Sequence, residues 1–366
     1  MKRILCVLAS LNMGGAETFM MKIFRNLQTD KKIDFIVSAE EGYYEKEILE
    51  LGGKIYRIPL RTQHPVRAFM DLKKIVQDNH YDTVLKLCET PIGVIDLIAA
   101  KLGGAHNLCV RSCNANAEEV RIKRMVDAIL RPLLNTVATV KIAPSDLAAE
   151  FTFGAKAVQR GEVVFLHNAL DLKQFTFSQQ DRERIRAKLG VENKLVIGHV
   201  GRFNQQKNHK FILKVFAELK KLAPNAVLLL VGKGELEAEI RSQIQNLGLE
   251  DSVRLLGVRD DVPKLLCAMD AFLFPSFYEG MPNTVIEAQT TGLPCVISDT
   301  ITAEAAVTPL VQMLPLELSA AEWAQKVLDA AYMPVVERTS AAELMKQAEY
   351  DIETCVMKFE RMFFRN

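Results

Sequence analysis

Two glutamates eight residues apart carry the clearest chemical signal in the sequence. Glu279 follows an apolar run that ends at Phe274, and Glu287 lies within the helix that the next residues predict, with Pro282 in its first turn. Backbone amides at a helix start point outward with a partial positive charge, so they can hold sugar hydroxyls or phosphate. Glu279 and Glu287 would then bind different parts of one polar ligand. The simpler interpretation is that Glu279 caps the helix and Glu287 is a solvated surface residue.

The composition restricts the class of protein. The chain has 366 residues, with 46 Lys plus Arg against 45 Asp plus Glu and a formal net charge of +1. A balance this close to zero provides no basic field for phosphates, so we expect no nucleic-acid partner. Seven scattered cysteines lack a Cys-x-x-Cys pair, which argues against a disulfide framework or a thiolate metal site.

The sequence also predicts no metal centre and no bound cofactor. It contains no Asp-x-Asp pair, and its six histidines lack the spacing of metal ligands. His199 lies within an apolar run, where a core histidine with satisfied hydrogen bonds is the simpler interpretation.

Apolar runs alternate with helix-like segments along the chain. Such alternation is typical of parallel sheets covered by helices on both faces. At about 150 residues per domain, the length predicts two domains. The polar segment 171–194 lacks strand alternation, so we interpret it as the linker between them. The predicted strands lie at 3–9, 33–37, 54–58, 82–87, 106–110, 137–143, 162–166, 195–200, 226–231, 253–256, 271–274, 294–298 and 310–314.

The predicted fold class is α/β, with two Rossmann-like domains and closing helices at the carboxyl end. The first domain is expected over 1–172 and the second over 190–345, while 346–366 is expected to be a helix that packs back towards the first domain. Two doubly wound domains that face each other form a cleft at the carboxyl ends of both sheets, where ligands usually bind. The predicted helices include 16–28, 208–222, 235–247, 261–268, 283–291, 303–307, 323–331 and 341–364.

The segment around Glu279 and Glu287, Phe-Tyr-Glu-Gly-Met-Pro-Asn-Thr-Val-Ile-Glu-Ala, resembles the Glu-x7-Glu signature of retaining family 4 glycosyltransferases, which have the GT-B fold. Other motifs of that family have counterparts here in the same order. The branch that builds bacterial capsular and exopolysaccharides is the most similar. The counterparts are Gly14-Gly15-Ala16-Glu17, His167-Asn168-Ala169-Leu170-Asp171, Gly201-Arg202-Phe203 with Lys207, Gly232-Lys-Gly-Glu235, and residues 256–262 and 292–296.

The resemblance implies transfer of a sugar from a nucleotide donor, a UDP-sugar, to a saccharide acceptor, with retention at the anomeric carbon and without a metal. Arg202 and Lys207 would neutralise the diphosphate as the glycosidic bond breaks. Glu279 would bind hydroxyls of the donor sugar, and Glu287 would accept hydrogen bonds from the ribose. The donor site would also include Gly14, Gly15, Val258, Arg259, Gly280, Met281, Pro282, Asn283 and Thr284.

Simpler alternatives exist for these motif residues. Arg202 and Lys207 also fit a solvated loop. Gly15 would let the chain approach the donor phosphates closely, or it would only form a tight turn. Ala169 stands where relatives have Gly, so it would be strained if that position needs a positive φ.

The first half of the chain lacks histidines that relatives of this branch carry. Their His-Ser-His and Ala-His-Ser-His-Asn segments correspond to Leu85-Lys86-Leu87 and Cys113-Asn114-Ala115-Asn116. In a retaining front-face mechanism the leaving phosphate itself can serve as the base, so this loss is compatible with activity. Glu89, Asn114 and Asn116 are the candidates for contacts to the acceptor, with turn formation as their alternative role.

The segment 118–134 bears on location. It predicts a basic amphipathic helix, which would either lie on an anionic membrane surface, where polyprenyl-diphosphate-linked acceptors reside, or cover the sheet with its charges in water. The apolar run 4–9 is too short for a signal peptide or a spanning helix, so we expect a cytoplasmic protein, peripheral at the inner membrane face. The helix carries apolar Ile122, Met125, Val126, Ile129, Leu130 and Leu133, and basic Arg121, Lys123, Arg124 and Arg131.

Two other functions remain open at this point. A UDP-sugar epimerase on the same fold would form its product without any acceptor. A GT-B protein with weak or no transferase activity would bind a nucleotide sugar or a partner enzyme, which fits the missing histidines.

Overall fold

The computed structural model describes residues 2–12, 14–38, 40–88, 90–113, 121–333 and 335–364, without the side chains of residues 121–124 and 335–337. The chain divides into two compact units, which are described one at a time. Unit 1 comprises Met1–Ala169 together with Asp351–Asn366, and unit 2 comprises Leu170–Tyr350.

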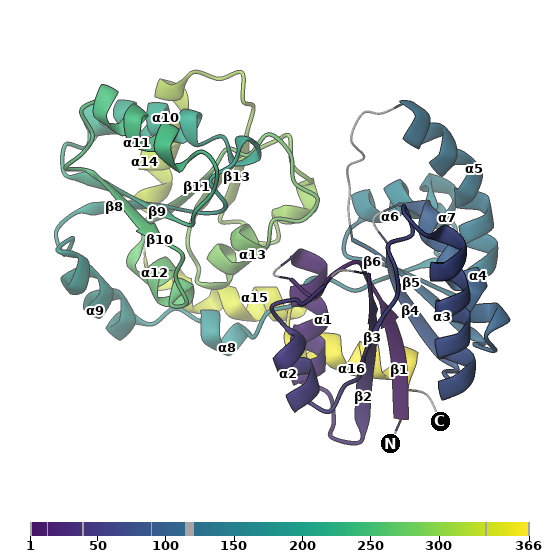
Figure 1. The fold of residues 1–366 in the computed structure, drawn as a ribbon. Coiled ribbons are helices and arrows are strands. Elements are labelled where there is room, and N and C mark those ends of the chain that lie inside the picture. Colours follow the sequence, from purple (N-terminus) through teal and green to yellow (C-terminus); the bar gives the residue numbers. More distant parts are fainter. Residues whose placement is uncertain are drawn as a thin grey trace. The chain divides into compact units, whose positions relative to one another are not determined.

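Among its described residues, unit 1 contains a seven-stranded parallel sheet with the order β3-β2-β1-β4-β5-β6-β7 (Figure 1). The strand order reverses between β1 and β4, and ligands of doubly wound sheets bind at such a switch point. The strands are β1 (Lys2–Val7), β2 (Lys31–Val37), β3 (Ile55–Arg57), β4 (Thr83–Cys88), β5 (Asn107–Ser112), β6 (Val140–Ala143) and β7 (Val163–Phe165).

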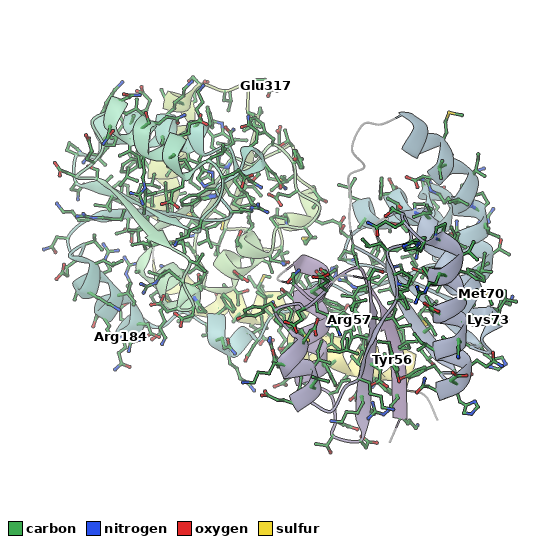
Figure 2. All side chains as sticks on the ribbon, viewed as in Figure 1. Tyr56, Arg57, Met70, Lys73, Arg184 and Glu317 are labelled. Carbon is green, nitrogen blue, oxygen red and sulfur yellow. The ribbon has the colours of Figure 1, made fainter. Side chains whose placement is uncertain are left out.

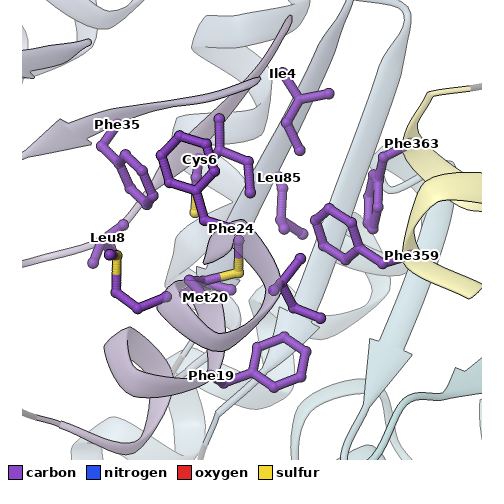
Figure 3. Close-up of a cluster of buried hydrophobic side chains, with 14 of the residues drawn as sticks. Ile4, Cys6, Leu8, Phe19, Met20, Phe24, Phe35, Leu85, Phe359 and Phe363 are labelled. Carbon is purple, nitrogen blue, oxygen red and sulfur yellow. The ribbon is translucent and has the colours of Figure 1, made fainter. Parts of the chain in front are cut away.

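Alternate residues of β1 point to opposite faces of this sheet, and helices cover both faces. Ile4 and Cys6 join one apolar cluster with residues of α1 and α16, which Figure 3 shows around Phe24 and Phe359. Leu5 joins the cluster on the other face. The helices are α1 (Gly15–Arg25), α2 (Glu45–Glu50), α3 (Pro65–Asn79), the short η1 (Pro91–Gly93), α4 (Val94–Leu102), α5 (Arg121–Val137), α6 (Asp146–Phe153), α7 (Ala155–Gln159) and α16 (Ile352–Phe363).

Unit 2 contains a second parallel sheet, with six strands among the residues that the structure describes and the order β10-β9-β8-β11-β12-β13. Here the order reverses between β8 and β11, so the loops that follow these two strands lie side by side. The strands are β8 (Leu195–Val200), β9 (Ala226–Val231), β10 (Val253–Gly257), β11 (Ala271–Phe274), β12 (Cys295–Ser298) and β13 (Val311–Leu314).

Helices pack on both faces of this second sheet, around two separate apolar clusters. The α/β fold class with two Rossmann-like sheets is therefore confirmed. The helices are α8 (Leu172–Phe175), α9 (Gln179–Leu189), η2 (Gln205–Lys207), α10 (His209–Leu222), α11 (Glu237–Asn246), α12 (Val262–Ala268), α13 (Asn283–Thr290), η3 (Ala303–Ala305), α14 (Ala320–Ala331), η4 (Val335–Ser340) and α15 (Ala341–Gln347).

The segment expected to be a linker, 171–194, contains two helices of unit 2, so that interpretation is wrong. Polar contacts hold α9 in place: Arg186 Nη1 lies 3.2 Å from an oxygen of Asp270, and Arg182 pairs with the same carboxylate. Asp270 also accepts a hydrogen bond from the backbone amide of Val196, at 2.7 Å. Because these contacts involve charges, α9 lacks the apolar periodicity by which a helix is recognised in a sequence.

Ala169 does not carry the strain that a positive φ would impose. Among the described residues, the non-glycine residues with a positive φ are His80, Asn208 and Glu349. Ala169 is buried, and its carbonyl accepts a hydrogen bond from Lys22 Nζ at 3.3 Å. The substitution for glycine is therefore compatible with the backbone conformation at this position.

Candidate active site

Two loops of unit 2 meet at the carboxyl edge of its sheet, one after β8 and one after β11. Their strands are neighbours in the sheet, so the loops lie together although more than 70 residues separate them. The amide of Phe277 donates to the carbonyl of Gln206 at 2.9 Å, and Gln206 Nε2 donates to the carbonyl of Tyr278 at 2.8 Å. Asn208 Nδ2 donates to the carbonyl of Pro275 at 3.2 Å. These hydrogen bonds fix the two loops to each other.

Lys207 and Glu279, both predicted from the sequence as site residues, are in direct contact. Lys207 Nζ lies 2.6 Å from Glu279 Oε1, and the two side chains are only 14% and 11% exposed. The same ammonium lies 4.6 Å from the centre of the Phe274 ring. The sequence indicated both residues but not their contact.

Arg202, the other predicted cation, is in a different environment. Its side chain is 72% exposed, and Nη2 lies 3.3 Å from a carboxylate oxygen of Glu235. Glu235 lies in one of the family motifs, but its residue type and spacing alone indicate no role for it. An exposed ion pair of this kind contributes little to stability, so Arg202 can change partners at low cost.

Glycine residues allow a third loop, after β9, to pack against the loop that carries Arg202. Gly232 has a φ of +138°, and a Cβ atom there would lie 2.0 Å from the carbonyl oxygen of Gly201. A Cβ at Gly234 would lie 2.3 Å from the carbonyl oxygen of Phe203. Side chains at these positions would therefore displace the loop after β8.

The predicted helix after Glu279 is α13, and it begins at Asn283 with Pro282 as its N-cap residue. The proline therefore precedes the first turn, one position earlier than expected. Asn283 and Glu287 are four residues apart, so they lie on the same face of α13. Thr284 Oγ1 and Ser276 Oγ are buried and have no hydrogen-bond partner among the described residues. Thr284 lies in the first turn of α13, and Ser276 lies in the loop between β11 and this helix.

Of the other predicted donor residues in unit 2, Met281 receives a hydrogen bond to its sulfur from the hydroxyl of Tyr350, at 3.8 Å. Gly280 lies directly before it in the loop. Val258 is 72% exposed. Arg259 makes two hydrogen bonds to Asp261, at 2.8 and 2.7 Å, and these lower the pKa of the Asp261 carboxyl. The side chain of Arg259 is therefore held by Asp261, two residues further along the chain.

Two buried histidines lie beneath the loop after β8. His199 Nδ1 lies 3.0 Å from the carbonyl oxygen of Leu273, whereas its Nε2 has no partner among the described residues, so the expected core histidine is only partly satisfied. His209, for which no sequence motif indicates a role, packs edge-on against His199 at 4.9 Å between ring centres. Burial lowers the pKa of His199 well below its ordinary value and that of His209 to about 4. Both imidazoles are therefore neutral at neutral pH.

In unit 1, the predicted Gly14 and Gly15 lie at the start of α1. Gly14 is the N-cap residue, and the carboxylate of Glu17 lies over it, since a Cβ there would be 2.3 Å from Glu17 Oε2. A Cβ on Gly15 would meet no described atom within 4 Å. Within the part of the chain that the structure describes, the surface over Gly15 is therefore open.

The acceptor-side candidates Glu89, Asn114 and Asn116 lie outside the described residues. Unit 1 has a cavity of about 170 Å³ at the carboxyl ends of β1 and β4, lined in part by Glu17, Arg61 and Lys86. Lys86 Nζ lies 3.0 Å from Asp96 Oδ2, and Arg61 pairs with the same buried carboxylate. Arg61 and Asp96 are 35 residues apart, so no local sequence pattern indicates this charge network.

No helix within the described ranges combines the length and the apolar composition that crossing a membrane requires. Residues 118–120 of the helix predicted at 118–134 lie outside the described residues, and the rest belongs to α5, which exposes apolar side chains. Met125 and Ile129 are 67% and 72% exposed, and Val126 and Leu133 are also exposed. Arg131, one of the predicted basic residues of this helix, donates a hydrogen bond to the backbone carbonyl of Phe151, at 3.0 Å.

Comparison with known proteins gives three findings. A family model described as glycosyl transferases group 1 matches residues 181–331. EpsF of Bacillus subtilis, which is named as a glycosyltransferase, is 33% identical over 363 residues, covering 96% of this chain and 94% of EpsF. A galactosyltransferase of Escherichia coli, named for transfer from UDP-Gal to α-D-GlcNAc-diphosphoundecaprenol, is 30% identical over 303 residues, covering 78% of this chain and 76% of that protein.

Among solved structures, Anabaena HepE in complex with UDP has a TM-score of 0.80 to this chain, at 20% identity. The likeness covers 99% of both chains, so it extends over unit 1 and unit 2 alike. At this level of identity the likeness concerns the fold, which is GT-B, as the motifs implied.

Proposed function

We propose that this chain, which belongs to the group 1 family of glycosyl transferases, transfers a sugar from a UDP-sugar to a saccharide carried on a polyprenyl diphosphate. The chain is a glycosyltransferase of a retaining, metal-independent family. The donor, the acceptor and the site residues are the parts that we propose.

The contact between Lys207 and Glu279 is the observation that carries the donor side of this proposal. Departure of the sugar leaves negative charge on a diphosphate, and a cation held in a fixed place stabilises that charge as it develops. Lys207 is held in this way, at 2.6 Å from Glu279. The carboxylate of Glu279 has further lone pairs, which would accept hydrogen bonds from donor sugar hydroxyls. One ion pair thus serves the leaving group and the transferred sugar.

The other donor contacts are proposed from the family motifs, together with the surroundings of each residue. Arg202 would leave its exposed partner Glu235 for the diphosphate, because a phosphate accepts two hydrogen bonds from one guanidinium. Amides at the start of α13, with Gly280 before them, would bind donor oxygens. Glu287, on the same face as Asn283, would accept hydrogen bonds from the ribose, and the backbone at Val258 and Arg259 would face the base. The open surface over Gly15 would admit the donor phosphates.

The acceptor class is proposed from the relatives. The E. coli galactosyltransferase named above acts on a sugar linked to diphosphoundecaprenol, and this chain covers 76% of its length. Glu89, Asn114 and Asn116 remain the proposed contacts to the acceptor sugar.

A panel of nucleotides tests the proposed donor. UDP and one UDP-sugar should raise the unfolding temperature, while GDP and GDP-mannose at the same concentration should leave it unchanged. A ligand at about 100 times its dissociation constant stabilises the folded state by about 2.7 kcal/mol, which a thermal-shift assay detects readily. Equal shifts with UDP and GDP would contradict the proposed base preference. If no nucleotide raised the unfolding temperature, the proposed donor site would be wrong.

We also propose that α5 places the enzyme on the inner membrane surface. Its exposed apolar residues Met125 and Ile129 are one helical turn apart, so they form one stripe. In the sequence, Arg-Ile-Lys-Arg at 121–124 directly precedes Met125, and basic residues combined with apolar ones suit anionic lipid head groups.

Replacing Met125 and Ile129 together with glutamate should lower binding to vesicles of phosphatidylglycerol and phosphatidylcholine about tenfold, because two inserted apolar groups become charged. Co-sedimentation measures the bound fraction. The matched control replaces Val66 and Met70 with glutamate, since both are exposed on α3 and Figure 2 shows Met70 at its outer side. If both double variants lost the same fraction of vesicle binding, α5 would not be the element that binds the membrane.

A further inference from the structure

Three aromatic rings form a stack beneath the loop that carries Lys207. Phe272 and Phe274 are alternate residues of β11, both fully buried, and their ring centres lie 5.9 Å apart with an angle of 17° between planes. His199 on the neighbouring strand stacks on Phe274 at 5.4 Å and on Phe272 at 6.3 Å. We call these three residues the ring stack.

Lys207 contacts one member of the ring stack. Its ammonium lies 4.6 Å from the centre of the Phe274 ring and 2.6 Å from Glu279 Oε1. The face of an aromatic ring carries partial negative charge, which attracts a cation without neutralising it. Lys207 is therefore held from two sides, by a carboxylate and by a ring face.

The two buried imidazoles near Lys207 add no positive charge to this support. His199 is fixed by its contact with the carbonyl of Leu273, at 3.0 Å, and it is neutral because it is buried. A neutral imidazole adds no positive charge that would compete with Lys207 for a phosphate. His209, at 4.9 Å from His199, is likewise neutral.

We propose that Phe274 is a positioning residue for Lys207: its ring holds the ammonium where the amine meets the donor diphosphate. This inference rests on the proposed function, because it concerns the same site. A ring of no net charge restricts the position of the ammonium and leaves the charge of Lys207 available to the ligand, which a second carboxylate would not do.

The experiment compares Phe274→Leu with Phe272→Leu. Both replacements remove a fully buried ring from the same strand, but among the described contacts only Phe274 touches Lys207. Isothermal calorimetry with UDP and with uridine measures the affinity that the diphosphate adds. Phe274→Leu should reduce the ratio of UDP to uridine affinity about fivefold, as expected for the loss of one cation–π contact. Phe272→Leu should leave the ratio unchanged while lowering the unfolding temperature by a similar amount.

A second measurement does not depend on any nucleotide. The rate at which acetic anhydride modifies Lys207, followed by peptide mass spectrometry, should rise severalfold in Phe274→Leu and stay constant in Phe272→Leu, because the ring shields and restrains the amine. Equal effects of the two variants on the acetylation rate, or no effect of either, would overturn the inference. A wild-type protein that binds no UDP, with the acetylation result as expected, would instead count against the proposed function alone.

Discussion

Replacing Lys207 with methionine should lower the rate of sugar transfer by about 10²- to 10³-fold, the usual loss when one preorganised group that stabilises developing charge is removed. Methionine keeps the apolar length of the side chain, so the main change is the loss of the cation. Transfer from a radiolabelled UDP-sugar, identified by the nucleotide panel, measures the rate.

Two further variants separate this effect from general ones. Lys210→Met removes one exposed positive charge three residues away and should have little effect on transfer. Lys207→Met also leaves Glu279, with an 11% exposed side chain, without its cation, and breaking such a pair costs about 3 kcal/mol of folding free energy. Adding Glu279→Gln to Lys207→Met should restore much of that stability but not the activity. A Lys207→Met enzyme as active as Lys210→Met would refute the assigned role.

Replacing Gly232 with alanine should destabilise unit 2 by about 3 kcal/mol, because two independent costs add at this position. The φ of +138° is one that L side chains rarely adopt, and the new Cβ would lie 2.0 Å from the carbonyl oxygen of Gly201. That oxygen belongs to the backbone of the loop carrying Arg202, so it cannot move without displacing the site. Denaturant unfolding measures the loss.

Gly248→Ala is the matched control for this prediction. Gly248 also has a positive φ, +63°, but a Cβ there would meet no described atom within 4 Å. Only the conformational cost remains, about 1 kcal/mol. The difference between the two variants therefore reports the collision with Gly201. If both variants lost the same stability, the close approach of the two loops would not constrain the fold.

Strands were the part of the structure that the sequence predicted best. The runs at 195–200, 226–231 and 271–274 match β8, β9 and β11 residue for residue, because strands buried on both faces of a parallel sheet are continuously apolar. The helix predicted at 303–307 is only the short η3 (Ala303–Ala305). Helix α9 was missed because its buried residues are Ile185 and Arg186, so ion pairs to Asp270 replace much of the apolar face that a sequence pattern would reveal.

The residues of the candidate site were indicated by motifs, but their contacts were not. Lys207 and Glu279 are 72 positions apart, and their ion pair depends on β11 pairing with β8 instead of with β10. Hydrophobic periodicity gives the strands but not their order in the sheet. Glu235 and His209 show a related limit of sequence patterns. Glu235 matters because it pairs with Arg202, which is distant in sequence, and His209 matters because it is buried.

The adjacency of β8 and β11 also sets the time at which the site can exist during synthesis of the chain. Lys207 leaves the ribosome together with β8, whereas Glu279 and the start of α13 follow more than 70 residues later, after β9 and β10. A contact of high sequence separation can form only after both partners have been synthesised, and closing the long loop between them costs conformational entropy. A nascent chain that ends before β11 therefore has only part of the proposed donor site, and its Lys207 lacks both the carboxylate of Glu279 and the ring of Phe274.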